Sequence, residues 1–142
     1  MTITRGIAVA ATFAAVAVGA ASPARADQTM SGHDIETVTD PSSGQSITND
    51  WYFTPCGDGC ASIVSNGSPL GQTRLVNGQW VMDVDGYPAG CADGSTVPNA
   101  ATAHWTWDPN TLAGTQQITD KVPVCGNPAG FTFTNNVQLR QA

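Results

Sequence analysis

The sequence predicts an all-β domain, an antiparallel up-and-down meander that forms a small closed or partly open barrel or, alternatively, a two-sheet sandwich. Three observations predict this class. Short runs of β-forming residues alternate with clusters of Gly, Pro, Asn and Asp, with no clear helical periodicity after the first 26 residues. Aromatic residues recur two positions apart, which places them on one face of a strand. Asn-Gly and Pro-Asn pairs separate several of the runs, as tight reversals require.

The first 26 residues are expected to be a secretory signal peptide. Arg5 gives a short positive start, an apolar run covers 7–21, and a small-x-small triplet stands at 24–26. Cleavage before Asp27 would leave 27–142 as a single secreted β domain. The apolar run is shorter than the roughly 20 residues of a membrane-spanning helix. We therefore expect an extracellular or cell-envelope protein without a membrane span after cleavage.

Four strands are expected in the first half of the domain. A polar, turn-rich linker at 40–49 follows the first strand, and Trp51 and Phe53 share one face of the second. Residues 61–64 form the β-rich run of the third strand, and the turn-forming stretch SNGSPLGQ at 65–72 follows it. These predicted strands lie near 33–39, 50–54, 60–65 and 72–77.

Four more strands are expected in the second half. Asn77-Gly78 suits a two-residue hairpin turn, because both residues tolerate positive φ. Trp80 and Met82 then alternate with polar or smaller residues, and Pro109-Asn110 marks a later reversal. These predicted strands lie near 79–85, 102–108, 112–119 and 131–140. Long loops, where binding residues tend to lie, are expected at 86–100 and 121–130.

The chain carries a net charge of −6, and the predicted mature part is more acidic still. Arg74, Lys121 and Arg140 are the only basic residues after the signal, against eleven acidic ones. This balance disfavours nucleic acid and anionic membrane surfaces as partners, and it keeps a secreted protein soluble. We expect a monomer whose partner is an unknown protein or small ligand.

The four cysteines, Cys56, Cys60, Cys91 and Cys125, are expected to form disulfides. An even number of cysteines in an exported chain favours disulfides, and four cysteines allow three pairings. A zinc site would need a second close pair of ligands. A redox pair would have two intervening residues and precede a helix, whereas three residues separate Cys56 from Cys60 and a strand follows.

A Cys56–Cys60 disulfide is the favoured interpretation of the stretch PCGDGC. Gly57 and Gly59 would supply the backbone freedom for so tight a loop, with Asp58 displayed at its tip. On this interpretation, the other two cysteines tie the long loops together. The chain-entropy estimate is roughly 2 kcal/mol for the short loop and roughly 4 kcal/mol for the long one.

No residue set predicts catalysis, a metal site or a cofactor. Asp83 and Asp85 are followed by no glutamate of the kind that closes a calcium loop. Ser62, His104 and Asp108 could be named as a triad, but no nucleophile elbow surrounds the serine. We expect a protein that is not an enzyme.

Five aromatic residues are the candidate ligand-lining residues. They could line a cavity in a barrel mouth, or they could pack as core, the interpretation favoured for Trp80 and Trp107. The five are Trp51, Phe53, Trp80, Trp105 and Trp107.

Several ordered motifs resemble those of a family of small secreted actinobacterial, especially mycobacterial, β-rich proteins with two cysteine pairs. The motifs are W-x-F-T-P-C-G-x-G-C, G-x-W-x-M, C-A-D-G, W-x-W-D-P-x-T-L-A-G-T and C-G-N-P, between Trp51 and Pro128. The resemblance implies export and brings no catalytic residues. The leading hypothesis is a non-catalytic binding or interaction protein. The alternatives are a carrier of small hydrophobic ligands with an aromatic-lined cavity, and an inhibitor that presents the Cys56–Cys60 loop.

Overall fold

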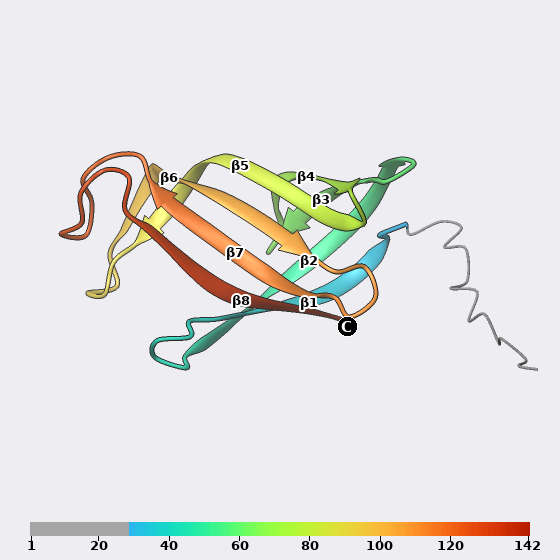
Figure 1. Ribbon diagram of the computed structural model, residues 1–142, viewed down its shortest axis with the longest axis horizontal. Helices are drawn as coiled ribbons and strands as arrows, with labels where there is room; N and C mark the ends of the chain where they lie inside the picture. The colour runs from blue at the N-terminus through green and yellow to red at the C-terminus, as the bar shows by residue number, and fades with distance from the viewer. Residues whose placement is uncertain (1–28) are drawn as a thin grey trace, which may run out of the picture.

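The computed structural model describes residues 29–142, which form a closed barrel of eight antiparallel strands (Figure 1). Each strand pairs with its neighbours in the sequence, and β8 closes the ring against β1. The predicted meander is confirmed, as a barrel and not as a two-sheet sandwich. The predicted signal peptide and its cleavage point lie outside the described residues. The strands are β1 (Gly32–Thr39), β2 (Ser46–Gly57), β3 (Cys60–Ser65), β4 (Ser68–Val76), β5 (Gln79–Gly90), β6 (Thr96–Trp107), β7 (Ala113–Asp120) and β8 (Thr132–Gln141).

The β5–β6 hairpin differs most from the prediction. The expected loop at 86–100 is wrong for most of its length, because β5 continues to Gly90 and β6 begins at Thr96. The register shifts on both sides of Tyr87, so β-bulges absorb the Gly and Pro residues that suggested a loop. The expected linker at 40–49 is likewise shorter, since β2 begins at Ser46.

Two Asn-Gly turns shape the first half of the barrel. Asn66 and Gly67 have φ values of 48° and 83°, and Asn77 and Gly78 have φ values of 50° and 79°. Positive φ at both central residues is the requirement of the hairpin turn whose twist matches the strands. The predicted turn at Asn77-Gly78 is therefore confirmed, and β4 begins directly after Asn66-Gly67.

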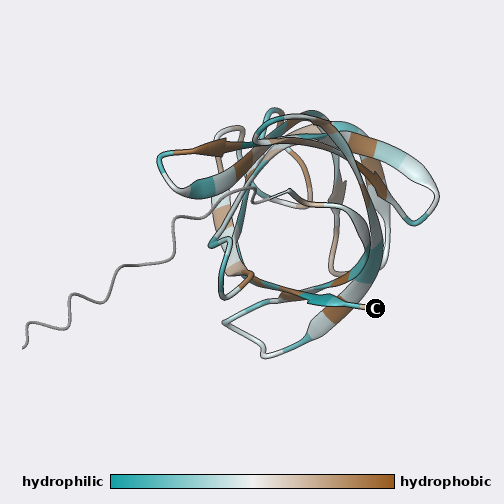
Figure 2. Ribbon diagram, turned by 90° about the vertical axis from the view of Figure 1, so that its right-hand side faces the viewer, coloured by the Kyte–Doolittle hydropathy of each residue, from teal (hydrophilic) through white to brown (hydrophobic). Residues whose placement is uncertain are grey.

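One end of the barrel is filled by a solid aromatic core. The ring centroid of Trp51 lies 6.0 Å from those of Phe53, Trp105 and Trp107. Trp80 stacks on Trp107 at 6.4 Å. All four tryptophans are buried, and they face inward because alternate residues of a barrel strand point to its interior. Viewed from this end, the strands form a closed ring (Figure 2).

Two disulfides staple the barrel. Cys56–Cys60 closes the β2–β3 turn, and Cys91–Cys125 joins the β5–β6 hairpin to the loop between β7 and β8. Both pairings match the interpretation favoured from the sequence. Disulfides are typical of chains that fold in an oxidising, extracellular environment.

Within residues 29–142 there is no helix long and apolar enough to cross a membrane.

Candidate ligand cavity at the barrel mouth

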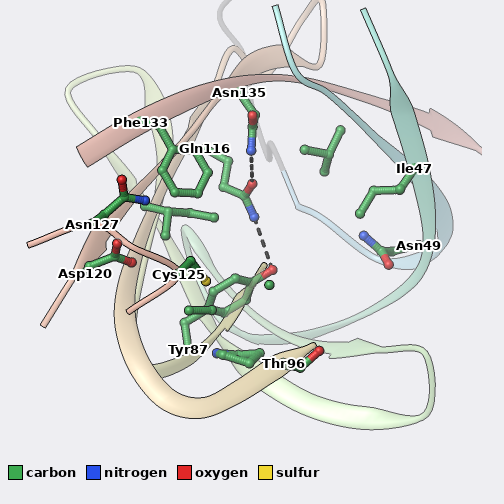
Figure 3. Close-up of a pocket in the computed structure, with 15 residues that line it drawn as sticks. Ile47, Asn49, Tyr87, Thr96, Gln116, Asp120, Cys125, Asn127, Phe133 and Asn135 are labelled. Carbon is green, nitrogen blue, oxygen red and sulfur yellow. Dashed lines mark hydrogen bonds between the residues drawn. The ribbon is translucent and has the colours of Figure 1, made fainter. Parts of the chain in front are cut away.

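A cavity of about 370 Å³ occupies the end of the barrel opposite the aromatic core. Its walls come from β1, β2, β5, β6, β7 and β8 and from the β7–β8 loop (Figure 3). Small-molecule sites commonly have volumes of roughly 300–1,000 Å³. The cavity is therefore large enough for a compact organic molecule.

A chain of polar side chains crosses the cavity. Asn135 Nδ2 donates a hydrogen bond to Gln116 Oε1 at 3.0 Å, and Gln116 Nε2 donates to the hydroxyl oxygen of Tyr87 at 3.3 Å (Figure 3). These residues come from β8, β7 and β5, so the chain links three strands across the barrel. Burial is the main cause of the raised pKa of Tyr87. The phenol therefore stays protonated and available as a hydrogen-bond donor.

A second polar chain connects the cavity to the core through Glu36. Trp105 Nε1 donates to Glu36 Oε1, and Asn49 Nδ2 donates to Glu36 Oε2, both at 2.9 Å. Asn49 lines the cavity, and its own oxygen accepts a hydrogen bond from Asn66 at the β3–β4 turn. Burial raises the pKa of Glu36 to about 7, although its two hydrogen bonds oppose the rise.

Apolar side chains form the rim. Ile47 and Phe133 line the cavity and are 64 % and 40 % exposed, and Phe131 lies 6.2 Å from Phe133 between ring centroids. Cys125 also lines the cavity, so the Cys91–Cys125 disulfide holds two wall segments together. Apolar walls around a few ordered polar groups are typical of small-molecule sites.

The five aromatic residues suggested as ligand-lining lie instead in the core. None of Trp51, Phe53, Trp80, Trp105 and Trp107 belongs to the described wall of the cavity. Trp105 is linked to the cavity through Tyr87, whose ring centroid lies 5.4 Å from its own. Trp105 is also the one of the four tryptophans whose indole N–H has a partner among residues 29–142.

The Cys56–Cys60 loop lies at the opposite end of the barrel from the cavity. Strand β2 starts at the mouth, where Ile47 and Asn49 line the cavity, and ends at Gly57. Asp58 at the tip is exposed, and the carbonyl of Gly59 accepts a hydrogen bond from Leu75 N. The inhibitor hypothesis for this loop stays a hypothesis.

The other candidate side chains lie apart from the cavity. His104 Nδ1 contacts Asp83 Oδ1 at 2.6 Å on the outer face of β5 and β6, and Asp108 accepts hydrogen bonds from the backbone of Asn110 and Thr111. Asp108 thus takes part in the turn that follows β6. Among residues 29–142, no three His, Cys, Asp or Glu side chains are placed to hold a metal ion.

The polar residues of the barrel interior were not predicted from the sequence. Glu36 shares its strand face with Val38, and Gln116 and Asp120 share theirs with Ile118. Residues two positions apart on a strand share a face, so this spacing could have indicated that the polar residues point into the barrel. It was overlooked because polar residues in an antiparallel strand are normally assigned to the solvent face.

Comparison with protein-family models, curated proteins and solved structures finds no significant match. The resemblance to small actinobacterial secreted proteins thus stays an expectation from sequence motifs.

Proposed function

We propose that this protein is a secreted, non-catalytic binding protein that carries a small ligand in the mouth of its β-barrel. The observation that carries the proposal is the cavity of about 370 Å³ beside a buried aromatic core. A barrel that needed only stability could fill its interior with side chains along its full length. Secretion is supported by the signal-like start of the sequence and by the two disulfides.

The wall fits a ligand that is mainly apolar and carries a few polar groups. Ile118 and Phe133 offer apolar contact, while Tyr87 and Asn135 end the polar chain through Gln116. Polar groups in fixed positions determine how a ligand is oriented, and burial of apolar area supplies much of its affinity. The carrier hypothesis was an alternative to the leading hypothesis of a binding or interaction protein, and we propose it here with a different set of lining residues.

Titration with the uncharged dye N-phenyl-1-naphthylamine tests this function, because its emission rises in an apolar site. We expect saturable binding to the exported, disulfide-bonded protein. Thr96→Trp should reduce the affinity at least about tenfold, equivalent to about 1.4 kcal/mol, because Thr96 lines the cavity and an indole would occupy part of it.

The matched control is Thr134→Trp, because Thr134 is exposed on β8 and does not line the cavity. This variant should bind the dye as the unmodified protein does. Absence of saturable binding to the unmodified protein, or equal loss in both variants, would contradict the proposal.

A further inference from the structure

The side chain of Asp120 is a buried acid on the cavity wall. It is 4 % exposed, and it lies at the end of β7, on the same strand face as Gln116 and Ile118 (Figure 3). Its backbone is fully engaged, since its N–H donates to Phe131 O at 2.9 Å and its carbonyl accepts from Gly130 N at 2.7 Å. The side chain therefore supplies the only polar group of Asp120 that a ligand could bind.

No partner for the Asp120 carboxylate is found among residues 29–142, neither a hydrogen-bond donor nor a cation. Its oxygens are not among the fully buried atoms that lack a partner, so they are open to the cavity and can pair with a ligand there. Lys121 is adjacent in the sequence, but its Nζ contacts Asp85 Oδ1 at 3.0 Å and Asn99 Oδ1 at 2.8 Å. The cation nearest to Asp120 in the sequence therefore binds other residues.

The remainder of the described cavity wall also lacks a positive charge. It contains no Lys, Arg or His, and its polar groups are amides, hydroxyls and Asp120. Glu36 is a second acid next to the cavity, but both its oxygens already accept hydrogen bonds from Trp105 and Asn49. An anionic ligand would therefore meet a carboxylate with no compensating cation.

Aromatic groups in the wall add to the attraction for a cation. Phe133 and Tyr87 both line the cavity, and the negative face of an aromatic ring attracts ammonium groups. A carboxylate together with aromatic rings is a suitable environment for an organic ammonium ion. The same rings provide apolar contact for the body of such a ligand.

We infer that the cavity selects small organic cations, whose ammonium group pairs with Asp120 while an apolar or aromatic body contacts Phe133 and Tyr87. The inference rests on the proposed carrier function and specifies its ligand class. It implies that simple carboxylates, such as short fatty acids, are poor ligands.

Three ligands of the same shape test this inference through displacement of N-phenyl-1-naphthylamine from the exported protein. They are 1-naphthylmethylamine, 1-naphthalenemethanol and 1-naphthoate, which are cationic, neutral and anionic at neutral pH. We expect the amine to displace the dye at least about tenfold more strongly than the alcohol, and the carboxylate to be the weakest. This order should persist at about 1 M salt. The Debye length is then about 3 Å, but salt screens a buried ion pair only weakly.

Asp120→Asn should remove the preference for the amine and leave displacement by the alcohol unchanged. Asp58→Asn is the matched control, since it removes the same charge at the opposite end of the barrel and should leave the preference intact. If Asp120→Asn fails to fold, the order of the three ligands and its resistance to salt in the unmodified protein still test whether the cavity prefers cations.

Equal displacement by amine and alcohol, or a preference abolished by salt, would overturn the cation inference while leaving the carrier function standing. Failure of the dye itself to bind would contradict the carrier function.

Discussion

Glu36 is a buried acid held by two hydrogen-bond donors, and its protonation affects both the core and the cavity. Its contact with Trp105 reaches into the aromatic core, and its contact with Asn49 reaches the cavity wall. Because burial raises the pKa of Glu36 from its usual 4.5 to about 7, the folded state binds the proton more tightly than the unfolded state does.

The stability of the protein should therefore depend on pH through Glu36. The stabilisation from its raised pKa is fully present below about pH 4.5, and it is lost as pH rises through about 7. The whole effect is of the order of 3 kcal/mol, at about 1.4 kcal/mol for each pH unit. Glu36→Gln should remove this pH dependence.

Urea unfolding of both proteins between pH 4 and pH 8 measures this difference. The other acids are common to both proteins, so the difference in their free energies of unfolding isolates Glu36. A difference that stays constant over this range would show that Glu36 has an ordinary pKa in the folded protein.

The functional residues could be predicted from the sequence only in part. The cysteine pairs were predicted correctly. Gly57 and Gly59 and the expected oxidising compartment favoured a tight disulfide at Cys56–Cys60. Glu36 and Asp120 were not, because an acid within a short strand looks the same whether it faces water or a polar cavity. Their inward position follows only once the strands close around a common interior.

At the scale of the strands, the close contact between β6 and β7 depends on one glycine. A Cβ at Gly114 would overlap the carbonyl oxygen of Thr106 and lie 2.6 Å from the Cα of Trp107. Both atoms belong to the backbone of the paired strand, so they cannot move without disturbing the ladder. Gly114 thus permits the backbone of β7 to approach Trp107 of the aromatic core.

Gly114→Ala should destabilise the protein by about 2–3 kcal/mol, as expected for an overpacked site next to a core. The matched control is Gly90→Ala, because a Cβ there meets no atom within 4 Å and its φ is not in the left-handed region. Thermal unfolding of both variants measures the effect. Equal melting temperatures for the two variants would show that β6 and β7 can separate without cost.

The strands themselves could be predicted well where apolar alternation was unbroken. Strand β3 was predicted with the bounds it has in the structure, and β7 was shifted by only one residue at each end. The end of β5 and the start of β6 were not predicted, because Gly86 and Pro88 are typical loop residues. Here they lie where the register shifts, which lets the ladder continue to Gly90.

At the scale of the whole molecule, the barrel combines a filled end with an open one. The four tryptophans occupy the filled end, and the cavity beyond Tyr87 and Gln116 occupies the mouth. The sequence could not decide between a barrel and a sandwich, because closure depends on strand tilt and stagger rather than on any single motif. The position of the cavity follows from that closure.

Mapping where a ligand binds tests the proposed cavity most directly. Amide resonances of the isotope-labelled, disulfide-bonded protein would be followed by NMR during titration with N-phenyl-1-naphthylamine. If the ligand binds in the cavity, the largest shift changes should occur at the mouth, around Ile47, Tyr87, Gln116 and Phe133, with none at Asp58. Changes confined to the Cys56–Cys60 loop or to the outer face of the barrel, or no changes at all, would contradict it.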